Sequence, residues 1–188
     1  MSIRVAGVPG SLREGSLNKG LLRAAVELAP AGMEIQIYTR LGDLPPYNDD
    51  VFQKGDPEPV ADLKTFISRA DAILISTPEY NYGIPGVLKN AIDWVSRPVA
   101  TNALRNKPVA VVGASTGAFG AAWAQAELRK VLAALGARVL DVELPVPHAH
   151  TRFEEGELID DEIRANLAEA VEALAAEIRA REGMKVVA

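Results

Sequence analysis

Short apolar runs along the chain alternate with longer segments in which apolar residues recur every three or four positions. The short runs predict buried β-strands, and the longer segments predict amphipathic helices. Regular alternation of the two is typical of a parallel sheet with helices on both faces. The predicted strands are residues 3–8, 34–38, 72–76, 108–113 and 138–142.

The clearest helix is predicted after the fifth strand. Acidic residues at 160–162 favour the positively polarised start of a helix. The apolar stripe that follows has helical spacing and consists of Ile163, Leu167, Val171, Leu174 and Ile178. We expect this helix to cover one face of the sheet, and we expect the tail at 183–188 to fray.

The predicted fold class is α/β, a doubly wound five-stranded parallel sheet with helices on both faces. Right-handed crossovers leave few topologies for such a sheet. Ligands of these folds bind beyond the carboxyl ends of the strands, where the strand order reverses. The loops after the first, third and fourth strands are therefore the candidate binding loops, and we call them the first, third and fourth loops.

Composition narrows the functional classes. A chain of 188 residues fits one domain, which we place at 1–182. It has no cysteine, so disulfides, thiolate metal sites and thiol redox relays are excluded, and redox chemistry needs a bound cofactor. A net charge of −5 without a long basic run argues against nucleic acid. No apolar run approaches the roughly 20 residues of a membrane span, and no secretory signal is visible, so a cytoplasmic location is expected.

The loop after the first strand, GSLREGSLN at residues 10–18, opens into an amphipathic helix. Small and hydroxyl residues at a helix start leave backbone N–H groups free to bind phosphate. The alternative is that Ser16 merely caps the helix. This loop alone does not decide between the two.

Two familiar nucleotide-binding loops do not fit these residues. Gly10 and Gly15 have the spacing of a Walker A loop, but Ser16 and Leu17 stand where Lys and Ser or Thr are required. The G-x-G-x-x-G pattern is also absent, and no acidic residue ends the second strand. An ATPase, a GTPase and a dinucleotide-binding Rossmann domain are therefore disfavoured.

The loop after the third strand, TPEYNYGIPG at residues 77–86, carries two tyrosines, an amide and four Pro or Gly residues. Backbone fixed by Pro and Gly can present N–H and C=O groups to a flat heteroaromatic ring, and an aromatic side chain can pack beside it. These features suit a flavin. A plain turn with surface tyrosines is the alternative.

Together these segments resemble the NADPH-dependent FMN reductase family, which includes bacterial chromate and quinone reductases and azoreductase-like members. The resemblance rests on GSLREGSLN at 10–18, PEYNYGIPGVLKNAIDWVSRP at 78–98 and, more weakly, GASTGAFGA at 113–121. It runs from the first strand to about residue 180. It implies a flavodoxin-like fold, non-covalent FMN, and two-electron transfer from NADPH or NADH to a quinone, chromate, an azo compound or free flavin.

The resemblance also implies roles for individual residues. In the first loop, where Gly10 lets the backbone approach, the FMN phosphate and part of the ribityl chain would be held by Ser11, Arg13, Ser16 and Asn18. The isoalloxazine ring would lie beside Pro78, Glu79, Tyr80, Asn81 and Tyr82. Its far edge would lie near Ser115, Thr116 and Gly117. Residues 44–48 resemble a segment that reaches a neighbouring subunit's flavin, with Tyr47 as a lid.

Because the cofactor carries the chemistry, no catalytic side chain is predicted, and one flavin face would serve donor and acceptor in turn by a ping-pong scheme. Glu79 is expected to orient its loop rather than to act as a general acid. His148 and His150 would point the same way in an extended segment, but two ligands do not make a metal site, so no metal is predicted. Trp94 and Trp123 are interpreted as core or interface anchors.

The helix predicted at 84–95 has an apolar arc of about 160°, wider than an ordinary core stripe, which predicts a homodimer or a homotetramer. The competing functions are a flavodoxin-like electron carrier and a flavin-binding protein without turnover. Carriers usually have strongly acidic surfaces, whereas −5 is mild and the first loop carries Arg13. The enzyme is therefore favoured.

Overall fold

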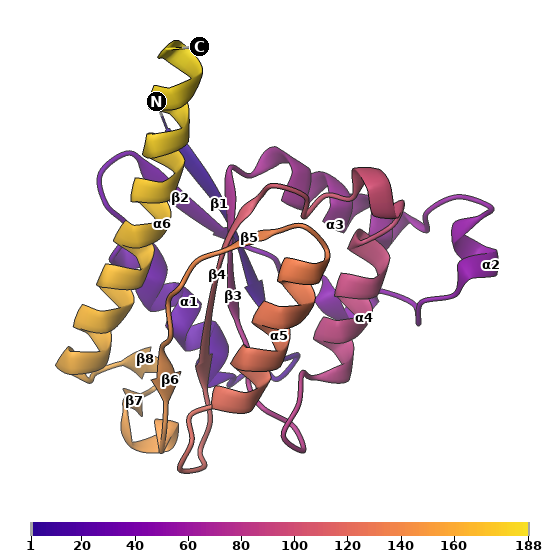
Figure 1. Ribbon diagram of the computed structural model, residues 1–188. Coiled ribbons are helices and arrows are strands. Elements are labelled where there is room, and N and C mark those ends of the chain that lie inside the picture. The colour runs from indigo at the N-terminus through magenta and orange to yellow at the C-terminus, as the bar shows by residue number, and fades with distance from the viewer. Residues whose placement is uncertain (1, 188) are drawn as a thin grey trace.

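A computed structural model describes the backbone of residues 2–187 and the side chains of residues 2–181. Its centre is a parallel sheet in the order β2-β1-β3-β4-β5, with β6 pairing beyond β5 on β4 (Figure 1). This order is that of the flavodoxin-like doubly wound fold, so the predicted fold class is confirmed. The strands are β1 Ile3–Pro9, β2 Met33–Ile37, β3 Ala72–Ser76, β4 Pro108–Ala114, β5 Arg138–Val139 and β6 Pro145–Val146.

The prediction of one continuous fifth strand at 138–142 is wrong. Two short strands, β5 and β6, pair in succession with β4, and residues 140–144 separate them. The guanidinium of Arg129 explains the interruption, because it binds the Val142 carbonyl at 3.2 Å and the carboxylates of Asp141 and Glu143 at 2.7 and 3.0 Å. Leu140 and Leu144 still bond to the backbone of β4, whereas the Val142 carbonyl between them bonds to this side chain instead.

Helices cover both faces of the sheet, as predicted. One face packs against α1 (Leu17–Glu27) and α6 (Asp161–Val187), and the other against α3 (Glu58–Arg69), α4 (Gly86–Val95) and α5 (Ala122–Ala134). The central strands β3 and β4 are buried along their whole length, whereas edge strand β2 alternates. Smaller elements are η1 (Leu41–Asp43), α2 (Asp49–Phe52), η2 (Val99–Thr101), η3 (Ala149–Thr151) and the hairpin β7 (Phe153–Glu154) and β8 (Glu157–Leu158).

The predicted stripe of α6 is confirmed, since all five of its residues are buried in one core cluster. Asp160 caps the helix by accepting the Ile163 amide at 3.0 Å, and this bond lowers the pKa of its carboxyl. The expected fraying at 183–188 stays a prediction, because it falls on Ala188 and on side chains outside the described residues. Within the described part of the chain, no helix is long and apolar enough to cross a membrane.

Two glycines let the binding loops pack tightly at the carboxyl ends of the strands. A Cβ on Gly113 would lie 2.6 Å from the Thr77 carbonyl oxygen, and one on Gly10 would lie 3.1 Å from Thr77 Cα. Gly10 therefore serves contact between the first and third loops, whereas the resemblance implied only an approach to phosphate. A backbone bond from Gly10 to the Ser76 carbonyl, at 2.8 Å, fixes the same junction.

Candidate active site

One groove at the carboxyl ends of β1, β3 and β4 gathers the three candidate loops. It encloses about 510 Å³ of empty space, a figure that includes its open mouth. The predicted site residues that line it are Ser11, Arg13, Ser16, Asn18, Pro78, Glu79, Tyr80, Ser115 and Thr116. Leu17 and Ala114 also line it and were not predicted, since small or apolar side chains give no chemical signal. Asn81, Tyr82 and Gly117 lie outside the lining.

Ser16 occupies the N-cap position of α1 without capping it through its side chain. Its backbone is extended (φ −71°, ψ 121°), and its carbonyl accepts the amides of Lys19 and Gly20 at 3.0 and 3.1 Å. Its side chain makes no cap bond, although the residue is only 6% exposed. The amides of Leu17 and Asn18, at the first two positions of α1, have no carbonyl of the preceding turn to bind within the helix. The Ser16 hydroxyl and the start of α1 thus lie together at the groove.

Arg13 and Ser11 complete the first loop. The Arg13 guanidinium donates to the Gly15 carbonyl at 3.1 Å and adds a positive charge beside the helix start. The Ser11 hydroxyl lies 3.4 Å from the Tyr80 hydroxyl, so it joins the first loop to the third. The positive charge of Arg13 favours an anion at this end of the groove.

Asn18 lines the groove, but its amide group is committed to the scaffold. Its Oδ1 accepts the Ser76 hydroxyl and the Ala114 amide, both at 2.9 Å, and its Nδ2 donates to the Ala114 carbonyl at 2.9 Å. The side chain, 3% exposed, therefore ties α1 to the ends of β3 and β4. This geometry indicates a positioning residue more than a direct ligand.

The third loop reverses direction at its tip. Tyr80 and Gly83 exchange two backbone bonds of 3.2 and 3.1 Å around Asn81 and Tyr82, which both have positive φ (51° and 62°). Such a turn normally takes Asn-Gly or Gly-Gly. It carries Tyr82 away from the groove, to 74% exposure, where the ring packs against Trp123.

Two carboxylates fasten this loop to α5. Glu79 Oε2 accepts the Ala124 amide at 3.1 Å, and Glu127 Oε2 accepts the Ile84 amide at 3.2 Å. The Glu79 bond is what the predicted orienting role requires. Glu127 was not singled out from the sequence, because one glutamate on a helix resembles any solvated charge.

The fourth loop is bonded to β6 and to the segment that follows it. Ser115 donates its amide to the Val146 carbonyl at 3.1 Å, and Gly117 accepts the His148 amide at 3.0 Å. His148 has positive φ (48°) and precedes η3, so the extended geometry assumed for His148 and His150 is wrong. Among the described residues, no group of three or more His, Cys, Asp or Glu could hold a metal ion.

The tryptophans and residues 44–48 take separate positions. Trp94 is fully buried and donates Nε1–H to the Pro45 carbonyl at 2.8 Å, and Tyr47 packs edge-on against it at 5.0 Å. Trp94 is therefore a core residue, whereas Trp123 is 42% exposed. Tyr47 does not line the groove of its own chain, so its role as a lid over a neighbouring flavin stays a prediction.

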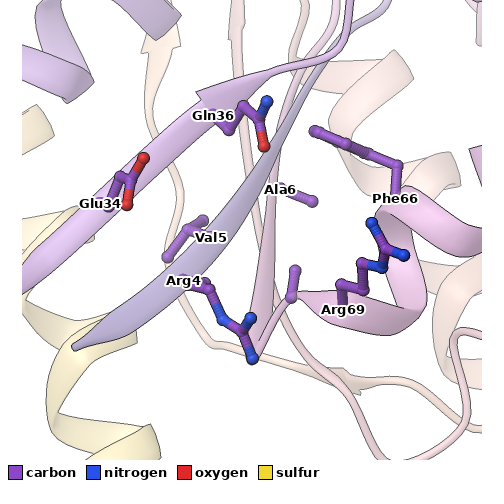
Figure 2. A pocket seen from close by; sticks show the side chains of 8 residues that line it. Arg4, Val5, Ala6, Glu34, Gln36, Phe66 and Arg69 are labelled. Carbon is purple, nitrogen blue, oxygen red and sulfur yellow. The ribbon is translucent and has the colours of Figure 1, made fainter. Parts of the chain in front are cut away.

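A second cavity lies away from the groove, between β1, β2 and α3 (Figure 2). Its lining includes Arg4 and Ala6 of β1 and Phe66 and Arg69 of α3. None of the predicted site residues lines it.

The groove fits FMN in two respects. The uncommitted Ser16 hydroxyl, the α1 start and Arg13 suit a phosphate, and the fixed turns of the third and fourth loops flank a slot in which a planar ring can lie. Fold and groove together define the class of flavodoxin-like, FMN-binding proteins.

Comparison with known proteins identifies the family. The model of the NADPH-dependent FMN reductase family matches residues 3–151, and the chain belongs to that family. It is 42% identical to an NAD(P)H-dependent FMN reductase of Pseudomonas aeruginosa, over 96% of this chain and 98% of that one. It is 39% identical to a 2-hydroxy-1,4-benzoquinone reductase of a Burkholderia species, over 96% and 99%.

A solved structure agrees. FerB, a flavoenzyme NAD(P)H:(acceptor) oxidoreductase from Paracoccus denitrificans, superimposes with a TM-score of 0.82 at 39% identity, covering 94% of this chain and 97% of FerB. The predicted family and fold are thus confirmed. The protein is an FMN-dependent oxidoreductase that takes electrons from a nicotinamide donor.

Proposed function

We propose that this protein passes two electrons from NAD(P)H, by way of bound FMN, to quinones, and by the same route to chromate, azo compounds and free flavin. The groove that joins three loops at the carboxyl edge of the sheet is the observation that carries the proposal. Its open mouth lets a second planar molecule approach the ring. Relatives named as benzoquinone and quinone reductases support quinones as the acceptor class.

In this proposal the residues of the groove divide into two sets. Ser11, Arg13 and Ser16 bind the phosphate together with the α1 amides, and Asn18 holds their loop against the sheet. The ring lies between the third and fourth loops, beside Pro78, Glu79, Tyr80 and Ser115. Asn81, Tyr82 and Gly117 lie outside the lining, and their contact with FMN stays a prediction. FMN supplies the hydride chemistry when it is bound, so the protein needs to bind, orient and exclude water.

Donor and acceptor use the same open side of the groove in turn. Oxidised nicotinamide leaves before the acceptor enters, which makes the reaction two half-reactions. The balance is simple: NAD(P)H gives a hydride, and a quinone takes two electrons and two protons to become a hydroquinone. The second proton comes from solvent at the open mouth.

Anaerobic titration of the holoenzyme tests this proposal. Purified protein should contain about one FMN per chain, since the three loops form a single groove. One equivalent of NADPH or NADH should remove the oxidised flavin's absorbance, and one equivalent of benzoquinone should restore it. A one-electron carrier would instead take up electrons in two separate steps. A flavin that neither donor reduces would contradict the proposal.

A further inference from the structure

Exposed aromatic side chains gather beside the groove. In the described part of the chain, the large hydrophobic residues that are both aromatic and exposed are Tyr80, Tyr82, Phe119 and Trp123. The whole chain has ten Phe, Trp and Tyr residues, so this concentration on two loops and the start of α5 is high. Tyr80 lines the groove, and the other three lie outside it.

Tyr82, Phe119 and Trp123 form one continuous group, which we call the aromatic shelf. The ring centroids of Tyr82 and Trp123 lie 5.3 Å apart at 79°, and those of Phe119 and Trp123 lie 4.5 Å apart at 59°. The shelf adjoins the groove, because Ala124, next to Trp123, donates its amide to the groove residue Glu79. The loops that carry the shelf project from the same edge of the sheet (Figure 1).

The backbone that presents the shelf is strained on both loops. Tyr82 holds a left-handed conformation at a turn position where glycine is favoured. Gly120 and Ala121, between Phe119 and Trp123, have positive φ as well (58° and 65°). Left-handed non-glycine residues are costly and concentrate at functional sites. A tyrosine at a turn position that favours glycine indicates that its aromatic ring has a function there.

The area of the shelf favours a small ligand over another protein chain. Three partly covered aromatic side chains offer far less than the about 800 Å² per partner that a stable interface buries. A bicyclic planar ring, in contrast, can be covered by two or three aromatic side chains. The shelf lies next to the groove, so a ring bound there would be close to the proposed flavin site.

We propose that Tyr82, Phe119 and Trp123 bind the planar ring of the electron acceptor, and that they favour bicyclic quinones over small or non-planar acceptors. The inference rests on the proposed function for its acceptor class. It assigns a specificity role to residues outside the groove, where they touch neither the phosphate nor the α1 start.

The test compares a naphthoquinone with ferricyanide, an inorganic acceptor without a ring. The double variant Phe119→Ala/Trp123→Ala should raise KM for the naphthoquinone about tenfold, the scale of one or two lost aromatic contacts. Its FMN content and its rate with ferricyanide should stay near wild type. Trp123→Phe, which keeps an aromatic ring, should bind the naphthoquinone nearly as well as wild type. Ile159→Ala, which shortens an exposed side chain elsewhere, should change the KM for neither acceptor.

Calorimetric binding of the naphthoquinone to oxidised holoenzyme separates this inference from the proposed function. Suppose that wild type binds the naphthoquinone, that the double variant binds it about tenfold more weakly, and that neither protein reduces it. The role of the shelf in binding would then be supported, and the proposed function would be contradicted. Equal KM values in variant and wild type, an equal loss with both acceptors, or no binding by wild type would overturn the shelf. A change in the sedimentation coefficient of the double variant, at unchanged KM, would also overturn the shelf, because these three rings would then form a contact between copies of the chain.

Discussion

At the scale of single residues, the groove separates ligand groups from supports by whether their polar atoms are already used. Ser16 is nearly buried and its side chain makes no cap bond, whereas Asn18 is equally buried and makes three side-chain bonds. Buried polar atoms are normally paired, and those of Asn18 are paired with the scaffold. The Ser16 hydroxyl makes no cap bond and lines the groove, where it can bind a ligand.

Ser16→Asp should weaken FMN binding at least about tenfold and riboflavin binding much less. A carboxylate about 4 Å from the phosphate, at an effective dielectric near 20, opposes each unit charge by roughly 4 kcal/mol. A third of that is already about tenfold. Aspartate is a good N-cap, so the melting temperature of the apo-protein should hardly change.

Fluorescence titration measures the affinity of wild type and variant for FMN and for riboflavin. Ser2→Asp is the control for an added charge at the other end of β1. An undiminished preference for FMN over riboflavin would remove Ser16 from the phosphate site.

Asn18→Ala should act on stability first. It leaves the Ala114 amide and carbonyl without their partner in a buried position, which costs on the order of 3 kcal/mol in unfolding free energy. Urea unfolding of the apo-protein measures the loss, and Ser16→Ala should show almost none. An Asn18→Ala apo-protein as stable as wild type, with weakened FMN binding, would make Asn18 a direct ligand instead.

At the scale of elements, the loop after β3 depends on α5. Glu79 and Glu127 each bind one amide across this junction, so α5 sets the position of the turn that borders the groove. A turn with two consecutive left-handed residues needs such external support.

Substitution of Glu79 separates positioning from acid catalysis. Glu79→Gln keeps an oxygen that can accept the Ala124 amide but cannot supply a proton, so positioning predicts kcat/KM and a pH profile close to wild type. Glu79→Ala should lower kcat/KM about tenfold, because the loop loses its anchor. A general acid would instead lose roughly 10²–10⁴ in rate in both variants. Steady-state kinetics over a range of pH decides between the two.

The sequence predicted the elements whose signal is local. Apolar runs gave β1, β3 and β4 within a residue or two, and helical spacing gave the buried stripe of α6. What it missed depends on distant contacts. Arg129 interrupts the fifth strand from another element, and the β7–β8 hairpin packs on α1 where a Cβ on Gly20 would lie 2.7 Å from the Phe153 ring. No short sequence pattern predicts the Arg129 contact or the packing of the hairpin on α1.

In the candidate site, too, the sequence predicted what has a local signal and missed what depends on distant contacts. Loop motifs identified most residues of the groove, because glycine, hydroxyl and tyrosine patterns reflect local turns and ligand chemistry. Asn81, Tyr82 and Gly117 were placed in it by their motif neighbours, yet the left-handed turn carries the first two outward. The roles of Asn18 and Glu79 appear only when their partners, Ala114 and Ala124, are known.

At the scale of the whole molecule, the wide apolar arc of α4 has an explanation within one chain. Leu88, Ala91 and Ile92 belong to the core, while Trp94 and Asn90 bind the Pro45 carbonyl from the opposite loop. The core and the loop that carries Pro45, both within the same chain, thus cover the arc. The predicted homodimer or homotetramer stays a prediction, and sedimentation velocity of the holoenzyme is the measurement that decides it.

At the scale of the whole molecule, the proposed function also predicts the kinetic order, because the third and fourth loops and the shelf border the same groove. If donor and acceptor both use its open side, they bind in turn. Initial rates with a quinone varied at several fixed NADPH concentrations should give parallel double-reciprocal lines, since the slope for one substrate does not depend on the other when a product leaves between them. Oxidised nicotinamide should compete with the quinone. Lines that intersect, with NADP⁺ not competitive against the quinone, would mean that both substrates bind at once, and a second substrate site would have to be sought on the protein.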